Sequence, residues 1–216
     1  MRNTIFCSIV LFCFFSCNAK ESQSLKTEPS QRSVTGKWIF EENDGCVYIF
    51  TFTDNECTTL FLGDEKDKTA KYEIEGEKIF TVYDEIRHEW DYEFQDEDTL
   101  KISIEADQRY FIGSRVKNNV TTLNGEYRLV NGVGYIWSFE FIDSSNVKIK
   151  WAGIHGDFIT DDSTYKIDGT SVILSPKVLR RDLEIVGDSI LLIMIPDSRY
   201  AVFVKTGKWI FEGNDG

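Results

Sequence analysis

The chain has 216 residues, a length that accommodates one or two domains. It is acidic, with 36 Asp and Glu against 24 Lys and Arg and a net charge of −12 at pH 7. Nucleic-acid-binding proteins carry clustered positive charge, so this composition argues against a nucleic-acid partner. The same charge permits a basic protein partner or a cationic ligand.

The first 16 residues have the pattern of a secretory signal peptide, because Arg2 is followed by the apolar run 5–15. This run is shorter than the roughly 20 residues that a transmembrane helix needs. Ser16 stands directly before Cys17, and the pair resembles the lipobox of bacterial lipoproteins, in which the cysteine is lipidated. The resemblance implies lipid attachment at Cys17 and a membrane anchor made of several acyl chains. An ordinary cleaved signal peptide is the alternative.

The segment 17–34 is polar and contains too few apolar side chains to bury a core of its own. We expect it to be a flexible tether that begins at the lipidated Cys17. A chain of this length and composition has an average reach of roughly 20–25 Å. The folded part would therefore lie close to the membrane surface.

Residues 35–45 recur almost unchanged as residues 206–216, with ten of eleven positions identical. A fainter copy begins at Asn124. Internal repeats of this kind indicate several units of the same fold. We predict one unit at 35–115, a linker at 116–123, a second unit at 124–205, and at 206–216 the start of a third unit that the chain does not complete.

Apolar and polar residues alternate along both units, for example over 72–75, 90–94 and 100–104. A period of two is typical of antiparallel strands with one buried and one wet face. Turn residues such as Asp54-Asn55 separate the strands. The sequence predicts an all-β fold made of two tandem antiparallel up-and-down sheets or barrels, each with about eight short strands. Two separate barrels and one merged sheet both fit this pattern.

Several motifs of the first unit resemble the small lipocalin-like (calycin-type) domains of bacterial lipoproteins. They are a Gly-x-Trp opening (Gly36, Trp38), a Phe-x-Phe strand (Phe50, Phe52), a Tyr-x-Ile-x-Gly turn (Tyr72, Ile74, Gly76) and a closing strand from Tyr110 to Arg115. The resemblance implies a β-barrel binding scaffold in the cell envelope. It also implies that Arg115 packs over Trp38. The second unit has Tyr127 and Lys205 at these two positions.

Aromatic residues are concentrated on a few strands of the first unit. The candidates for an apolar ligand pocket are Trp38, Tyr48, Phe50, Phe52, Trp90, Tyr92 and Phe94. The simpler interpretation is that these side chains form a packed barrel core. A cavity larger than about 300 Å³ would favour a ligand.

The run 190–195 of the second unit is apolar on both faces of its expected strand. Neighbouring side chains on a strand point to opposite sides, so one row must be covered by something other than the barrel core. Taking Ile190 as an inward residue makes Leu191, Ile193 and Ile195 the outer row. We expect this row to form the seam between the units or a docking face for a partner, with a covering local loop as the alternative.

The sequence shows no catalytic constellation, metal-ligand set or cofactor motif. His88 and His155 are isolated, and Cys46 and Cys57 have no histidine partner. A disulfide between these cysteines is doubtful, because Cys57 lies opposite Phe52 if 54–55 is a hairpin tip. Residues 43–45 could be proposed as a calcium loop, but Asn-Asp-Gly is a good tight turn on backbone grounds alone.

These observations predict a bacterial envelope lipoprotein that is anchored to a membrane and is not an enzyme. It would be a β-barrel binding module for a protein or for a small hydrophobic ligand. An alternative is an acidic inhibitor of a basic cell-wall hydrolase such as lysozyme, which charge would steer into contact. An enzyme is the least supported alternative. The sequence leaves open which membrane carries the anchor and which face it is on.

Overall fold

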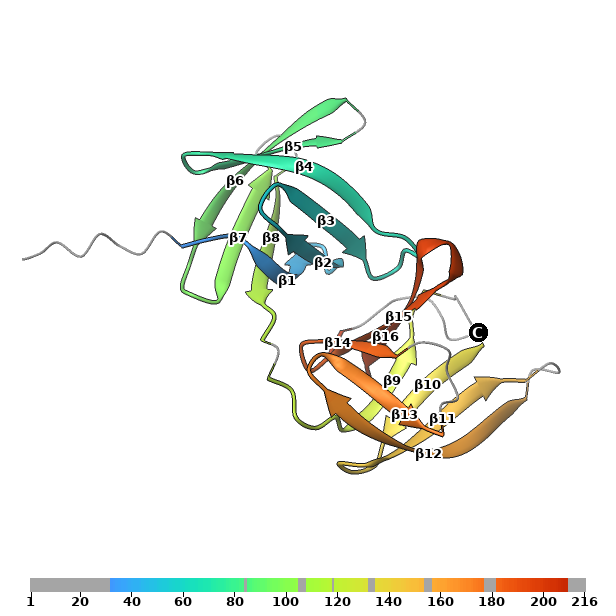
Figure 1. The fold of residues 1–216 in the computed structure, drawn as a ribbon. Coiled ribbons are helices and arrows are strands. Elements are labelled where there is room, and N and C mark those ends of the chain that lie inside the picture. The colour runs from blue at the N-terminus through green and yellow to red at the C-terminus, as the bar shows by residue number, and fades with distance from the viewer. Residues whose placement is uncertain are drawn as a thin grey trace, which may run out of the picture. The chain divides into compact units, whose positions relative to one another are not determined.

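The computed structural model describes residues 32–83, 85–104, 108–117, 119–131, 135–153, 157–176 and 182–209. The predicted signal peptide, Cys17, His155 and Phe211 lie outside the described residues. Within the described ranges the chain forms two closed antiparallel barrels of eight strands each, which confirms the predicted fold class (Figure 1). No helix among the described residues is long and apolar enough to span a bilayer.

The strands follow one another around each barrel in chain order, and the last strand pairs with the first. The first barrel contains β1 (Gly36–Glu42), β2 (Val47–Phe52), β3 (Glu56–Phe61), β4 (Lys68–Glu75), β5 (Lys78–Tyr83), β6 (Ile86–Phe94), β7 (Thr99–Ile104) and β8 (Arg109–Arg115). The second contains β9 (Gly125–Leu129), β10 (Ile136–Phe141), β11 (Asn146–Ala152), β12 (Phe158–Asp168), β13 (Ser171–Ser175), β14 (Leu183–Val186), β15 (Ile190–Ile195), a 3-10 turn η2 (Pro196–Ser198) and β16 (Arg199–Lys205). Closure leaves no unpaired sheet edge.

Equivalent contacts close both barrels. Trp38 on β1 is the partner of Arg115 on β8, and Tyr127 on β9 is the partner of Lys205 on β16. The Arg115 guanidinium lies 4.2 Å from the Trp38 ring centroid, which confirms the packing expected for this pair. Lys205 Nζ lies 5.9 Å from the Tyr127 ring centroid.

The residues just before β1 are hydrogen-bonded to the first barrel. Trp38 Nε1 donates to the carbonyl of Val34 at 2.7 Å. Arg115 donates from Nη1 to the carbonyl of Thr35 and from Nη2 to that of Ser33, both at 2.8 Å. Gly36 has a φ of 126° and a Cβ there would lie 3.1 Å from Arg115 Nη1, so glycine alone fits this approach comfortably. Residues 33–35 are therefore held against the barrel ahead of its first strand.

Each barrel encloses an apolar core. The fully buried core of the first barrel includes Trp38, Phe40, Phe52, Ile79, Leu100 and Ile102. The core of the second barrel includes Tyr127, Phe139, Phe141, Ile149, Leu183 and Phe203. These side chains alternate along their strands with outward residues, as the period of two predicts.

The structure corrects the face assigned to the row on β15. Leu191 and Ile193 are buried in the core of the second barrel, and Ile195 packs against that core. Ile190 and Leu192 face outward into a third apolar cluster, together with Val47, Ile49, Leu60, Leu62, Val186, Val202 and Val204. Arg32–Gly216 is one compact unit. The seam therefore exists, but the opposite row of β15 forms it.

A one-residue slip explains the wrong face. Leu100 pairs with Gly113 in the first barrel, and Leu191 pairs with Phe203 at the equivalent place in the second. The sequence analysis took Ile190 as the inward residue, and Ile190 lies one position before the residue equivalent to Leu100. Because side chains alternate along a strand, shifting the register by one residue exchanges the two faces.

The start of the third repeat does not form a strand in its described part. Residues 206–209 are turns. Trp209 packs against the third cluster, and its Nε1 donates to Glu41 Oε1 at 2.8 Å. A closed barrel offers no strand edge to which this segment could pair.

Candidate functional site

The first barrel contains an open cavity of about 600 Å³. Its lining comes from strands β2 to β8, so the cavity enters the barrel interior. The lining residues are Tyr48, Phe50, Cys57, Thr59, Lys68, Ala70, Thr81, Tyr83, Arg87, His88, Glu89, Trp90, Ile104, Arg109 and Phe111. The volume exceeds the threshold of about 300 Å³ that distinguishes a ligand cavity from a filled core.

Three of the seven predicted pocket residues, Tyr48, Phe50 and Trp90, line this cavity. Trp38 and Phe52 are instead 0% and 1% exposed in the core beneath. Tyr92 and Phe94 border a second hollow of about 510 Å³, whose other lining residues are Glu77, Asp91, Glu93, Lys101 and Ser103. The structure thus divides the predicted set between one cavity, the core and a polar hollow.

The walls of the cavity are aromatic. The Phe50 and Trp90 ring centroids lie 6.0 Å apart. Tyr48 meets Phe111 edge to face at 5.6 Å. Rings packed against one another in this way form a rigid surface on which a planar or aliphatic ligand can lie.

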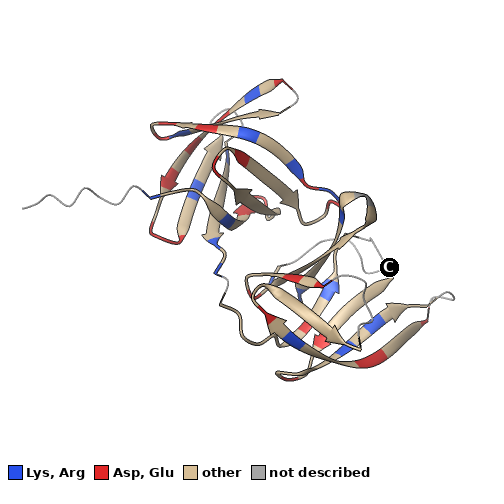
Figure 2. Ribbon diagram, viewed as in Figure 1, with Lys and Arg blue, Asp and Glu red and all other residues tan. Residues whose placement is uncertain are grey.

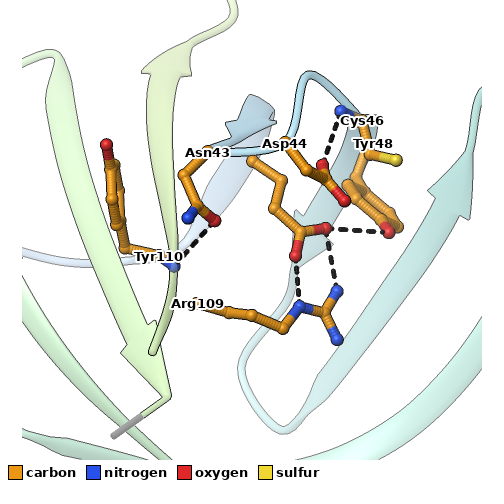
Figure 3. Close-up of polar contacts among 7 residues, drawn as sticks. Asn43, Asp44, Cys46, Tyr48, Arg109 and Tyr110 are labelled. Atoms are coloured by element: carbon orange, nitrogen blue, oxygen red, sulfur yellow. Dashed lines mark hydrogen bonds and ion pairs between the residues drawn. The ribbon is translucent and has the colours of Figure 1, made fainter. Parts of the chain in front are cut away.

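An ion pair between a buried carboxylate and a half-exposed guanidinium lies at the end of β1. Trp38 and Phe40 point inward from β1, and the same alternation turns Glu42 inward, where its side chain is 1% exposed. Arg109 donates to this carboxylate from Nε to Oε1, and from Nη2 to Oε2 at 2.8 Å. Tyr48 adds a hydroxyl bond to Oε2 at 3.2 Å (Figure 3). A buried carboxylate requires such partners, because its desolvation is costly.

The ionisation of these groups follows from their contacts. The hydrogen bonds to Glu42 raise the pKa of Arg109, which stays charged. Burial, and then the charge of Glu42, raise the pKa of Tyr48 to about 12. Tyr48 is therefore a neutral hydroxyl donor at neutral pH, and Glu42 occupies that donor.

The turn 43–45 holds the end of β1 next to β8. The backbone N–H of Asn43 donates to the carbonyl of Tyr110 at 3.1 Å. Asp44 Oδ1 accepts from the backbone N–H of Cys46 at 2.9 Å, and this bond lowers the pKa of Asp44 (Figure 3). This is a side-chain-supported tight turn, as its Asn-Asp-Gly sequence predicts.

Ligand atoms of Glu42, Asp44 and Cys46 lie within 4.8 Å of one another, a spacing that a metal ion could bridge. Two observations count against a cation there. Arg109 already neutralises Glu42, and burial raises the pKa of the Cys46 thiol, which disfavours the thiolate that binds metals. The cluster is better suited to holding the guanidinium.

The rim of the cavity carries further charges. Arg87 lies 3.9 Å from the Phe80 ring centroid and pairs with Glu75 at 3.5 Å. Glu89 pairs with Lys78. Lys68 Nζ lies 5.9 Å from the Tyr83 ring centroid, and the described residues give it no ion-pair partner.

Both described cysteines are free thiols, and Cys57 lies opposite Phe52 as expected. Burial raises the pKa of Cys57, which lines the cavity, to about 12. A thiol with this pKa is protonated and unreactive at neutral pH. Cys57 is therefore a part of the cavity wall and not a nucleophile.

The second barrel does not repeat the ion pair. Asn131 occupies the position equivalent to that of Glu42. It follows Leu129 by two residues, as Glu42 follows Phe40. The Asn131 amide donates to the carbonyl of Tyr200 at 2.6 Å and accepts from the backbone N–H of Val202 at 3.2 Å. Sequence analysis missed Glu42 and Arg109. The available signal was a carboxylate on the inward side of the Trp38–Phe40 alternation.

Comparisons with known proteins assign no family to the chain. No protein-family model matches the chain, and no curated protein matches it. Among solved structures, it is similar to one described as a DNA polymerase III beta subunit from Eubacterium rectale, with 9% identity and a TM-score of 0.17. That alignment covers 79% of this chain and 56% of the other. At this TM-score the likeness carries no argument about fold or function.

Proposed function

We propose that this protein is a non-catalytic binding module of the bacterial envelope and that its first barrel takes up a small, largely apolar ligand. The observation that carries the proposal is the cavity of about 600 Å³ with walls of Tyr48, Phe50, Trp90 and Phe111. Small-molecule sites are typically concave, apolar and about 300–1,000 Å³ in volume. The lipobox-like Ser16-Cys17 pair supports a lipid anchor, and the lipocalin-like motifs support a binding scaffold.

The chemistry of the lining supports binding more than catalysis. The thiol of Cys57 is protonated at neutral pH, and the carboxylate of Glu42 is held by Arg109 and Tyr48. General acid–base catalysis needs a group that can exchange a proton near the working pH. The Cys57 thiol does not meet this requirement.

Titration with N-phenyl-1-naphthylamine, a neutral apolar dye that fluoresces when it leaves water, tests the proposal. Saturable binding at one site is expected. Ala70→Phe should abolish it, because Ala70 lines the cavity and the new ring would fill it. Thr69→Phe is the matched control, since Thr69 is an exposed neighbour on the same strand. Equal binding by both variants would contradict the assignment.

The anchor has its own test. Expression in bacteria with radiolabelled palmitate should label the wild type and not Cys17→Ala. Cys13→Ala should label normally, because bulky Phe12 and not a small residue precedes Cys13. Labelling of Cys17→Ala would remove the anchor from the proposal and leave the cavity unaffected.

The alternative of an acidic hydrolase inhibitor rests on the net charge of −12. Acidic residues occur on strands and turns of both barrels, with basic residues among them (Figure 2). Several are paired, as Asp98 is with Lys117 and Glu126 with Arg128. Such a distribution favours the cavity over a single acidic docking face as the binding site.

A further inference from the structure

We propose that the ligand of the first barrel is a small amphipathic acid, with an apolar body against the aromatic walls and one oxyanion bound by Arg109. The inference rests on the proposed binding function and goes further by naming the chemical class of the ligand. Three features carry it: the unused donors of Arg109, the position of Glu42 behind it, and the charge balance of the lining.

Arg109 keeps donors for a ligand. A guanidinium has five N–H groups, and Arg109 donates from Nε and Nη2 to Glu42. Nη1 donates to no atom of the described residues, and Figure 3 shows it on the side of the guanidinium away from the carboxylate. The Arg109 side chain is 43% exposed and lines the cavity. An oxyanion in the cavity can therefore accept from Nη1 and from the second N–H of Nη2.

Glu42 orients this donor set. Its side chain is 1% exposed and does not line the cavity, whereas Arg109 lines the cavity and its side chain is 43% exposed. A ligand that enters the cavity thus meets the positive end of the pair and lies farther from the negative end. Two bonds to one carboxylate also fix the plane of the guanidinium, so little side-chain entropy is lost on binding. Glu42 is a positioning residue in this arrangement.

The charge balance of the lining favours an anion. The lining has three cations, Lys68, Arg87 and Arg109, and one carboxylate, Glu89. Carboxylates outside the lining pair with Arg87 and Arg109, so the positive charge left over is that of Lys68. Glu89 is engaged by Lys78. Lys68 has no carboxylate partner among the described residues. A cationic ligand would meet this excess of positive charge, and a neutral hydroxyl would leave it unused.

A matched pair of dyes tests the inference in the full chain. N-phenyl-1-naphthylamine and 8-anilino-1-naphthalenesulfonate share one ring system, and the second adds a single oxyanion. The protein should bind the sulfonate at least about tenfold more tightly, the usual effect of a charge-assisted hydrogen bond. The double variant Glu42→Gln/Arg109→Met should lose this preference and keep its affinity for the neutral dye. Changing both residues avoids a buried unpaired carboxylate.

Two further variants locate the effect. Lys68→Gln should reduce the preference in part, because Lys68 contributes charge without a fixed geometry. Arg199→Met in the second barrel should leave it unchanged, since Arg199 pairs with Glu65 and does not line the cavity. Replacing the sulfonate by naphthalene-1-carboxylate in competition, with naphthalene-1-carboxamide as its neutral match, shows whether a carboxylate is accepted.

The outcomes separate the two proposals. Tighter binding of the sulfonate that disappears in the double variant supports the amphipathic acid. Binding of the neutral dye without a preference for the sulfonate overturns the acid and retains the apolar cavity. A preference that survives the double variant overturns the role of Arg109. Failure of both dyes to bind overturns the proposed function, and the inference with it.

Discussion

Gly113 on β8 leaves room for the ring of Phe40 on the partner strand β1. A Cβ atom at Gly113 would lie 2.4 Å from Phe40 Cε1 and 2.6 Å from its Cζ. Phe40 is fully buried, and its ring centroid lies 4.7 Å from that of Phe50, a wall residue of the cavity. The absence of one methyl group therefore determines where the aromatic floor of the site lies.

Gly113→Ala should destabilise the first barrel. The added methyl cannot be accommodated without moving Phe40, and overpacking of this kind costs about 1–3 kcal/mol. The thermal midpoint and the midpoint of urea unfolding measure the loss. Ser114→Ala is the control, because Ser114 is exposed and should change stability by less than about 0.5 kcal/mol. Equal stability of both variants would show that the core adjusts freely.

Arg109→Met alone should destabilise the protein more than the double variant Glu42→Gln/Arg109→Met. The single change leaves the carboxylate of Glu42 buried and uncompensated. Breaking a fully buried pair costs about 3–5 kcal/mol. Because Arg109 is half-exposed and solvent screens its charge, we expect a loss of about 2–3 kcal/mol here. Urea unfolding of the wild type and both variants gives the comparison. A double variant as unstable as the single one would contradict the pairing.

Stability should fall as the pH rises from about 9 toward 12. Burial raises the pKa of Cys57 from 9.0 to about 12, so the folded state keeps the proton after the unfolded state has lost it. The buried thiol contributes its full stabilisation below pH 9, and this stabilisation is lost as the pH approaches the pKa of Cys57 in the folded state. At pH 10.5 the Cys57→Val variant should have lost about 1–2 kcal/mol less free energy of unfolding than the wild type, measured by urea unfolding. Parallel curves for both proteins would contradict the burial of the thiol.

Neighbouring leucines on β15 should respond differently to lysine. Leu191 is buried in the core of the second barrel, so Leu191→Lys should abolish its folding. Leu192 borders an open hollow of about 210 Å³ together with Glu184, which lets a lysine reach solvent. Leu192→Lys should therefore keep the β-sheet signal in circular dichroism and lower only the thermal midpoint. The reverse order would restore the face assignment made from the sequence.

Trp209→Ala should lower stability by about 1–2 kcal/mol, because it removes packing against the third cluster and the bond to Glu41. Lys208→Ala, an exposed neighbour, should have no measurable effect. Differential scanning calorimetry compares the two. An unchanged midpoint in Trp209→Ala would make the start of the third repeat a passive remnant.

The strand pattern was predictable because the driving force is local and periodic. Leu100 and Ile102 alternate with polar neighbours, and both are buried as expected. β15 was less predictable because its two faces are equally apolar, so the sequence held no register signal there. Only the pairing of Leu191 with Phe203 identifies the inward row.

The cavity was only partly predictable for a different reason. Aromatic residues indicate an interior, but whether they fill it depends on where each ring lies, as the contrast between Phe52 and Phe50 shows. The partnership of Glu42 with Arg109 spans 67 residues of sequence. It required the closure of β1 against β8, which no local pattern encodes.

The clamp that Arg115 and Trp38 form on Ser33, Val34 and Thr35 bears on how this protein withstands mechanical load. A pull on the chain from its N-terminal side arrives through the backbone at that point. Two hydrogen bonds from Arg115 on the last strand and one from Trp38 on β1 hold these residues to the barrel. Such a pull must break these three bonds before it reaches β1 and the cavity walls.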